Sequence, residues 1–422
     1  MPGAALVWRS AADRLSQKQL KKTQRTVAIK RISVYMLAMP RIAIHPSRAI
    51  ADLVRERRRE LKLTLREVQE RTVQAGHPIP FTSLAKVEKG EVDPGVRRLH
   101  LLLKLYHLPL QLAGDLLDLE DMTEVRPAET APDVLYQEGV AFWKRGDMRR
   151  GLACLFALRH AVPKNPHSRL LRQKSLLSFA IVAGSLGKYR LSRQIADDLL
   201  LEGPDPTLIV PVLIQAAHCW HWLGSEEAAL GFLARAETHV APAAHQERAW
   251  ILHEKASALV GLSEFKLADS ALTKALRAYT KAGDVYGKSR AMAALTRLRF
   301  EQRDPAGALK VARSARRHAE THGFDRLKRL RRIDEGRAHM LVGNTATGLS
   351  VLNAALAESL AADDKVAQFH AHYYLWKAYT TARNRDRAEL ELKSAIYYVQ
   401  FIDEVSKEAL EIREVGFRRE RK

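Results

Sequence analysis

The sequence predicts an all-α protein in which a small domain of five short helices precedes a long α-solenoid. Residues 47–120 contain five short amphipathic segments, with a break between the second and the third. Residues 132–402 form one continuous run of helical patterns, interrupted by a turn about every 40 residues. Turns at such a regular period are typical of stacked helical repeats, each of which contacts its neighbours along the chain.

Composition limits the class of protein. The 422 residues are 46% hydrophobic and 28% charged, and no stretch approaches the ~18 uninterrupted apolar residues of a membrane-spanning helix. The apolar stretch at 32–44 is interrupted by Pro40 and Arg41 and lies too far from the N-terminus to act as a signal peptide. We therefore expect a cytoplasmic protein with no membrane partner, whose Cys154 and Cys219 are reduced core thiols.

Charge favours an anionic partner. The net charge is +21, which is typical of proteins that bind nucleic acid or another anionic surface. Residues 1–47 hold nine Lys or Arg and one Asp or Glu. Residues 1–46 lack sustained periodicity, so they are either a disordered basic leader or an extension from a start site assigned too early. Residues 120–131 are polar and contain Pro127, which predicts a linker, and residues 403–422 predict a charged C-terminal helix.

The five short helices are predicted one by one. Residues 47–63 form an amphipathic helix, and residues 64–71 form a second one whose Thr64 and Glu67 have the spacing of a capping box. A connection with Gly and Pro follows, and then "PFTSLAKVEKGEVDP" at 80–94 predicts a third helix that ends at a glycine. Two Leu-rich helices follow, at 95–109 and 110–120. This order is that of a helix-turn-helix domain, in which the third helix enters the major groove.

Residues 47–119 resemble the Xre/Cro/C1-type helix-turn-helix family, through "IADLVRERRRELKLTLREVQER" and "LAKVEKGEVDPGVRRLHLLLKLYHLPL". The resemblance implies a five-helix, λ-repressor-like fold that binds double-stranded DNA. The sequence departs from the family pattern in three ways: the connection between the second and third helices is longer, and the residues Leu65 and Gln69 differ from those usual at their positions. The implied base-facing residues are Phe81, Thr82, Ser83 and Lys86, and the implied phosphate-facing residues are Thr64, Arg66 and Lys89.

These residue types suit the chemistry independently of the family. Thr, Ser and Lys hydrogen-bond base edges, and Phe contacts the thymine methyl group. Lys86 is the candidate for guanine. The run "RERRRE" at 55–60 has two interpretations, as extra positive charge beside the DNA or as a solvated helix face with internal ion pairs.

The solenoid is predicted from turns and small residues. The turns fall at residues 146, 187, 224, 263, 303, 343 and 383. Five residues after each turn stands a small residue, and seven residues further stands Ala or Leu, so that two antiparallel helices can approach closely. The first set is Gly151, Ser192, Ala229, Ala268, Ala308, Gly348 and Ala388, and the second is Leu158, Leu199, Ala236, Ala275, Ala315, Ala355 and Ala395.

This pattern resembles the tetratricopeptide repeat (TPR), with "YQEGVAFWKRGDMRRGLACLFALRHAVPKNP" as the first of seven units over 132–402. The resemblance implies a concave surface that binds a peptide or a protein segment as an effector. Its basic and aromatic lining would suit an extended ligand with carboxylates and apolar side chains, although packing roles are an equal alternative. The implied lining residues are Trp143, Lys144, His218, His221, Trp222, His253, Arg290, Arg297, Arg337, His370, Tyr373 and Lys377.

Other chemistry is not expected. The sequence has no phosphate loop, no GxSxG motif and no Gly-rich dinucleotide fingerprint, so we expect no enzyme, no catalytic residue and no cofactor. His218 and His221 lie three apart on one helix face, but nothing near them in sequence completes a metal site, and no metal is expected. The basic run at 325–332 is a solvated face, a ligand clamp or a second nucleic-acid surface.

The function predicted from the sequence is that of a bacterial-type transcriptional regulator, similar to peptide-sensing quorum regulators. The helix-turn-helix would bind DNA as part of a homodimer, and the TPR solenoid would bind a peptide or protein effector. The alternative is a TPR interaction scaffold or antitoxin-like protein, in which the helix-turn-helix is a docking module. The operator, the effector and the direction of regulation do not follow from the sequence.

Overall fold

The structure is a computed structural model that describes residues 46–123, 127, 131–162, 168–241 and 244–420. The predicted leader therefore lies outside the described residues, apart from Pro46, and so does half of the predicted linker. The described residues form helices and no strands. No helix among them is long and apolar enough to span a membrane.

The chain divides into two compact units, of which the first ends at Gly95 and the second begins at Val96. The sequence prediction instead placed a domain boundary after residue 119. The two predicted Leu-rich helices, α5 (Val96–Leu105) and α6 (Leu110–Asp121), fall within the second unit. There the buried ammonium group of Lys188 lies 3.0 Å from Asp115 and 2.6 Å from Asp118 of α6.

Three helices make up the described part of the first unit: α2 (Arg48–Glu60), α3 (Leu65–Gln74) and α4 (Phe81–Glu88). Their apolar faces meet in a small core that includes Val54, Val68 and Leu84, each at most 1% exposed. The predicted capping box is present at the start of α3. These contacts place α4 against both other helices.

The second helix is longer than predicted and the connection after it is shorter. α3 continues to Gln74, and Thr72 in its last turn is fully buried. The Thr72 hydroxyl donates to the Gln69 carbonyl at 2.7 Å and accepts from the Ile79 N–H at 3.0 Å, which ties the end of the connection to α3. The turn after α4 contains Gly90 at φ +69°, as the helix-ending glycine predicts.

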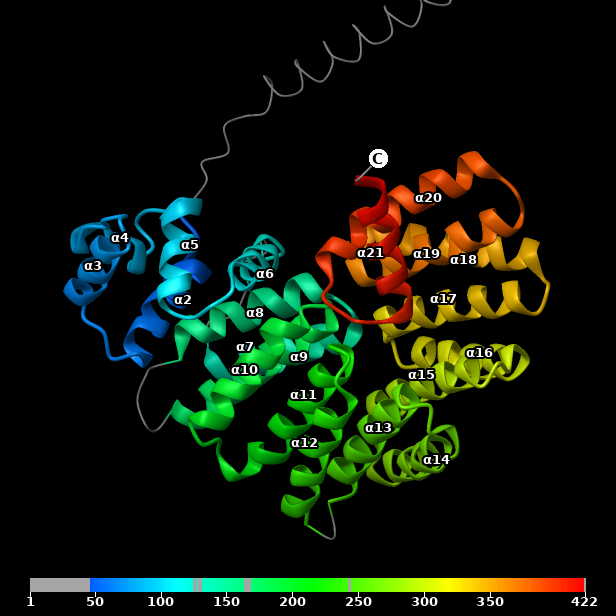
Figure 1. Ribbon diagram of the computed structural model, residues 1–422. Coiled ribbons are helices and arrows are strands. Elements are labelled where there is room, and N and C mark those ends of the chain that lie inside the picture. Colours follow the sequence, from blue (N-terminus) through cyan, green and yellow to red (C-terminus); the bar gives the residue numbers. More distant parts are fainter. Residues whose placement is uncertain (1–45, 124–126, 128–130, 163–167, 242–243, 421–422) are drawn as a thin grey trace, which may run out of the picture. The chain divides into compact units, whose positions relative to one another are not determined.

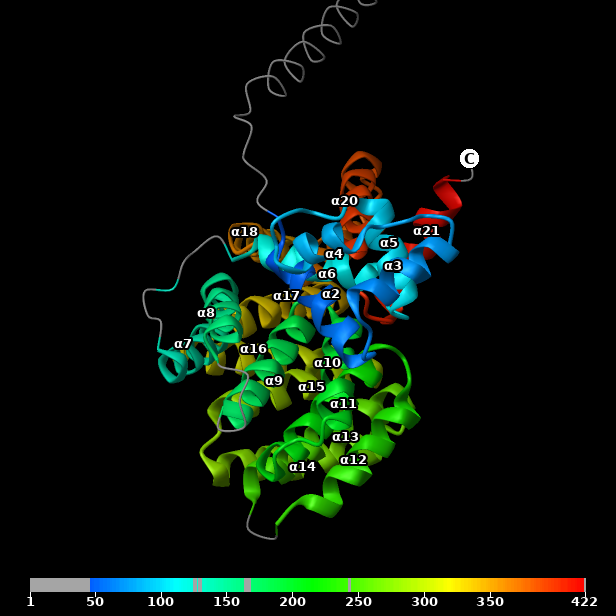
Figure 2. The same cartoon turned by 90° about the vertical axis from the view of Figure 1, so that its left-hand side faces the viewer.

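Antiparallel helix pairs make up most of the second unit, and each pair packs on the next along the chain (Figures 1 and 2). The pairs are α7 (Pro132–Arg145) with α8 (Met148–Ala161), α9 (Arg169–Ser185) with α10 (Tyr189–Leu201), α11 (Ile209–Trp222) with α12 (Glu226–His239), α13 (His245–Gly261) with α14 (Phe265–Ala282), α15 (Val285–Glu301) with α16 (Pro305–Thr321), α17 (Asp325–Leu341) with α18 (Thr345–Ala361), and α19 (Lys365–Thr381) with α20 (Arg385–Tyr398). A last helix, α21 (Lys407–Glu420), follows residues 402–406, which are not helical.

Each predicted turn position carries a left-handed backbone. Positive φ occurs at Gly146, Gly187, Gly224, Ser263, Arg303, Gly343 and Arg383. A single residue of this conformation ends one helix and redirects the chain into the next. Three of the seven are not glycine, so the conformation itself tolerates a side chain where the space around the turn is open.

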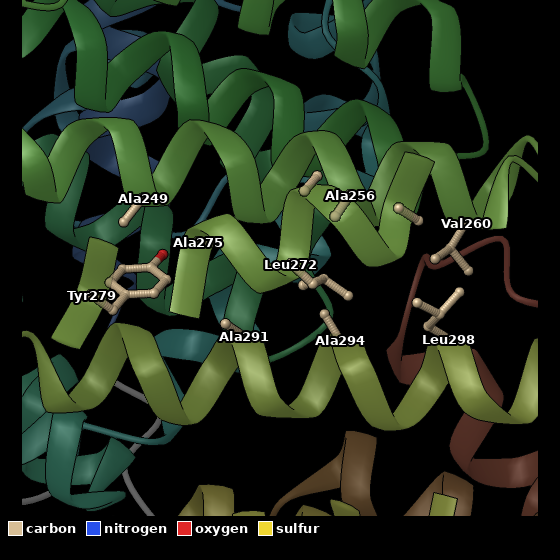
Figure 3. Close-up of a cluster of buried hydrophobic side chains, with 11 residues drawn as sticks. Ala249, Ala256, Val260, Leu272, Ala275, Tyr279, Ala291, Ala294 and Leu298 are labelled. Carbon is tan, nitrogen blue, oxygen red and sulfur yellow. The ribbon is translucent and has the colours of Figure 1, made fainter. Parts of the chain in front are cut away.

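Small residues bring the paired helices together. All members of the two predicted small-residue sets are buried, from Gly151 and Leu158 in the first pair to Ala388 and Ala395 in the last. A Cβ atom on Gly336 would lie 2.7 Å from Leu352, which shows how closely α17 and α18 approach. Figure 3 shows the same packing between α13, α14 and α15, where alanines surround Leu272 and Tyr279. The core is therefore a row of close helix contacts.

Candidate functional site

The outward face of α4 carries most of the residues predicted to contact bases. Phe81 is 41% exposed, Thr82 and Lys86 are exposed, and Ser83 is half-buried. The opposite face turns Leu84 and other apolar residues into the core. The predicted phosphate contact, Lys89, is also exposed, one turn after Lys86 on the same side of the helix.

The end of α3 and the start of α4 are joined by side chains. The Phe81 N–H donates to Gln69 Oε1 at 2.7 Å, so Gln69 satisfies a backbone donor at the start of α4 that Pro80 cannot cap. The guanidinium carbon of Arg66 lies 5.9 Å from the centre of the Phe81 ring. Gln69, a departure from the family pattern, thus has a clear local role.

Thr64 acts first as a helix cap. Its hydroxyl accepts from the Glu67 N–H at 3.2 Å, and its own N–H donates to Glu67 Oε2 at 2.6 Å. These hydrogen bonds lower the pKa of the exposed Glu67 carboxyl. Thr64 and Arg66 are both exposed, so their predicted phosphate contacts are sterically open.

An ion pair between α2 and α4 was not foreseen from the sequence. Arg58 Nε and Nη2 donate to Glu88 Oε1 and Oε2 at 2.6 and 2.8 Å. The two side chains are 13% and 8% exposed, so Arg58 is not part of a solvated face. Neither interpretation of residues 55–60 included this role, although Arg57 does make the expected pair within the helix, with Glu60 at 2.7 Å.

The concave side of the solenoid contains a cavity of about 470 Å³, which is within the size range of small-ligand sites. Nine of the twelve predicted lining residues face it. These are Trp143, His218, His221, Trp222, His253, Arg290, Arg297, Arg337 and His370. Lys144, Tyr373 and Lys377 do not line it: Lys144 lies over the Tyr286 ring, and the other two contact Glu411 of α21.

Buried carboxylates, which the prediction of a basic and aromatic lining did not include, accompany the basic residues of the cavity. Glu254, 4% exposed, accepts from Arg290 at 2.8 Å and contacts His218 Nδ1 at 2.9 Å. Burial opposes ionisation of Glu254, but His218 and Arg290 outweigh it and hold the pKa well below its usual value. Burial lowers the pKa of His253 to about 3, so this imidazole is neutral.

Arg297 differs from the other cavity cations. It donates to His221 Nε2 at 2.9 Å and to the Ser257 carbonyl at 3.0 Å, and its guanidinium lies 5.3 Å from the centre of a Trp222 ring. His221 Nδ1 is 2.6 Å from Glu226. Within the described part of the chain Arg297 has no carboxylate within 4.0 Å. Arg297 therefore lines the cavity without a carboxylate partner of its own.

The C-terminal segment, residues 402–411, contributes to the same site. The Val405 N–H donates to the Trp222 carbonyl at 2.7 Å, and Glu404, 1% exposed, lies 3.3 Å from His370. Residues 404–408 line the cavity itself. The sequence analysis missed this segment. Acidic residues at 404, 408 and 411, spaced four and three residues apart, were the available signal.

The remaining candidates have structural partners. His218 and His221 contact two different carboxylates, those of Glu254 and Glu226. In the ranges that the structure covers, no three His, Cys, Asp or Glu side chains gather as metal ligands. In the basic run at 325–332, Arg326 and Arg329 form buried ion pairs with Asp364, so the run is not simply a solvated face.

Neither a protein-family model nor a curated protein matches the sequence. Solved structures do. A Rap protein complexed with competence and sporulation factor has 14% identity and a TM-score of 0.51, over 65% of this chain and 78% of that one. NprR with its cognate peptide NprX has 12% identity and a TM-score of 0.46, over 69% and 84%. Bacillus thuringiensis PlcR with the peptide PapR7 and DNA has 11% identity and a TM-score of 0.41, over 67% and 98%.

The likeness to the Rap protein concerns the fold. The described residues are all-helical and form a TPR-like solenoid, as the spacing of turns and small residues predicted.

Proposed function

We infer that this protein is a sequence-specific DNA-binding transcription regulator. In this proposal residues 47–119 act as an Xre-type helix-turn-helix, and α4 enters the major groove with Phe81, Thr82, Ser83 and Lys86 toward the bases. Thr64, Arg66 and Lys89 contact phosphates. The observation that carries the proposal is the exposed outward face of α4. The helix itself is positioned by the apolar core beneath it, by Gln69 at its start and by the ion pair of Glu88 at its end.

The solenoid is the effector-binding part of the proposal. Its cavity is lined by several helix pairs, and among the described residues its half-buried Arg297 has no carboxylate partner within 4.0 Å. An effector that binds one curvature of the solenoid more tightly than another would shift the balance between the two. In a homodimer this shift would alter the spacing of two α4 helices, which must lie about 34–36 Å apart on DNA.

Selection of bound sequences from a random DNA library tests the DNA-binding part of the proposal. The full-length protein is incubated with a random duplex library, and bound DNA is sequenced after several rounds. We expect one enriched motif, which the Lys86→Ala variant alters or loses. Absence of any enriched motif, or the same motif at the same strength from the variant, would contradict the proposal.

A second candidate function is that of an interaction scaffold, in which the first unit only docks to another protein. It is favoured by the solenoid, which occupies most of the chain. Lys86→Ala separates the two functions, because a scaffold retains its partners when this side chain is removed, whereas a regulator loses promoter selectivity.

A further inference from the structure

We propose that residues 402–411 occupy the effector site of the solenoid, which comprises the cavity and the polar contacts beside it. We further propose that the effector is an acidic peptide that replaces these residues. The inference rests on the proposed effector role of the solenoid and adds the chemical class of the ligand. The segment follows the last helix pair and lies along turns of the second and third pairs, which are far away in the sequence.

The backbone of the segment binds as an extended peptide would. The Asp403 N–H donates to the Gly187 carbonyl at 2.9 Å, and the Val405 N–H donates to the Trp222 carbonyl at 2.7 Å. Alternate residues thus hydrogen-bond to two successive turns of the solenoid. Extended ligands commonly gain affinity from such main-chain bonds and specificity from the side chains between them.

Two turn glycines leave room for the segment. A Cβ on Gly187 would lie 2.7 Å from Ile402, and a Cβ on Gly224 would lie 3.2 Å from Val405. The turns at Ser263 and Arg303 have the same left-handed backbone and carry side chains. Glycine at 187 and 224 is therefore explained by the close approach of the segment and not by the turn alone.

Carboxylates supply most of the side-chain contacts. Asp403 accepts from the backbone N–H groups of Tyr189 and Arg190 at 2.7 and 2.8 Å, at the start of α10. This is the position that favours an anion, because the first N–H groups of a helix lack partners within the helix. Glu404 contacts His370. Two consecutive acidic residues thus occupy two separate polar sites.

Carboxylates of the helical part of the segment also contact the solenoid, on α17 and α19. Glu408 accepts from the Tyr374 hydroxyl at 2.8 Å and lies 3.4 Å from Arg337. Glu411, three residues later, accepts from the Tyr373 hydroxyl at 2.7 Å and also contacts Lys377. The segment therefore offers carboxylates and apolar side chains, the chemistry that the basic and aromatic lining residues would suit.

These contacts define the peptide that would compete with residues 402–411 for the site. It has two consecutive acidic residues between β-branched apolar residues, as in Ile402-Asp403-Glu404-Val405, and further acidic residues one and two helical turns later. A segment tethered to its own site has an effective concentration on the order of mM, so a free peptide competes only when it is abundant or when the tethered copy is weakened.

The test uses full-length protein and a fluorescent synthetic peptide of residues 400–418. The weakened protein carries Asp403→Asn, Glu404→Gln and Glu408→Gln, and the matched control carries Glu414→Gln, whose carboxylate forms an ion pair with Arg418 of the same helix. We expect the weakened protein to bind the peptide at least about tenfold more tightly than wild type, because charge-assisted hydrogen bonds are lost from the tethered copy. The control should match wild type, and a peptide with the same three substitutions should not bind.

Hydrogen exchange on wild-type protein provides a second readout that does not depend on a variant folding. Excess unlabelled peptide should lower the protection of the chain's own residues 403–411. Unchanged protection, together with no gain in peptide binding by a folded weakened protein, would make the segment a permanent cap of the solenoid and overturn the proposal. Both readouts are independent of DNA, so their failure is distinguishable from failure of the DNA selection.

Discussion

Arg58 and Glu88 form a two-pronged ion pair that joins α2 to α4 at N–O distances of 2.6 and 2.8 Å. Arg58 also donates to the Leu63 carbonyl at 2.7 Å, and Arg55 donates to the Glu88 carbonyl at 3.1 Å. The orientation of α4 is therefore fixed at its C-terminal end by polar contacts, in addition to the apolar core beneath it.

Removal of one partner should destabilise the first unit strongly. Glu88→Ala leaves the Arg58 guanidinium mostly buried without its carboxylate, and a broken buried pair costs about 3–5 kcal/mol. Denaturant unfolding, read by hydrogen exchange of residues 48–88, measures the loss. Glu60→Ala is the control, because its pair with Arg57 is half-exposed and should contribute less than about 1 kcal/mol. Equal effects of the two substitutions would show that the Arg58–Glu88 pair is not structural.

Lys86 and Lys89 should affect DNA binding in different ways. Lys86→Ala should lower discrimination between the selected motif and single-base variants by about 5- to 150-fold, equivalent to about 1–3 kcal/mol. Lys89→Ala should weaken binding to all sequences alike and reduce the dependence of log K on log salt by about one unit. Fluorescence anisotropy at several salt concentrations measures both quantities.

A lysine outside the first unit serves as the control for the Lys86→Ala and Lys89→Ala variants. Lys274→Ala, on an exposed position of α14, should change neither discrimination nor salt dependence. If Lys86→Ala and Lys89→Ala weaken all sequences equally, α4 contacts the DNA backbone and does not recognise bases.

Sequence reasoning succeeded where the determinants are local and repeated. The turn at residue 263, the small residue Ala268 and the packing residue Ala275 follow one another within a single helix pair, and the same order recurs in each pair. It failed where two segments far apart in sequence meet. The contact between Trp222 and Val405 depends on how far the solenoid curves over many repeats, which no local pattern specifies. Nine of the twelve predicted lining residues do line the cavity, but a carboxylate partner that is distant in sequence, such as Glu254 beside His218, was missed for the same reason.

Two glycines in helices should respond oppositely to alanine. Gly336→Ala should destabilise the solenoid by about 1–3 kcal/mol, because the new Cβ would lie 2.7 Å from Leu352 and force α17 away from α18. Gly231→Ala should stabilise it by about 0.5–1 kcal/mol, because its Cβ would meet no atom within 4 Å and alanine favours the helix. Urea unfolding of the two variants compares them directly, and destabilisation by both would contradict the close approach at Gly336.

The contacts that bind residues 402–411 to the solenoid should weaken as the pH rises. Burial by itself would lower the pKa of His370, but the carboxylate of Glu404, together with Glu408 and Asp334, raises it above its ordinary value of 6.5. A raised pKa in the folded state means that the His370–Glu404 pair stabilises the segment fully below pH 6.5, and that this contribution is lost as the pH rises through the raised value. Burial lowers the pKa of His253 to about 3, so this group stays neutral from pH 6 upward, and burial also lowers the pKa of His221. Protection factors of residues 403–411, corrected for the intrinsic exchange rate, should therefore fall between pH 6 and pH 8.5.

His370→Gln should show reduced protection at pH 6 and little change with pH, whereas an unchanged pH profile in this variant would assign the dependence to another group.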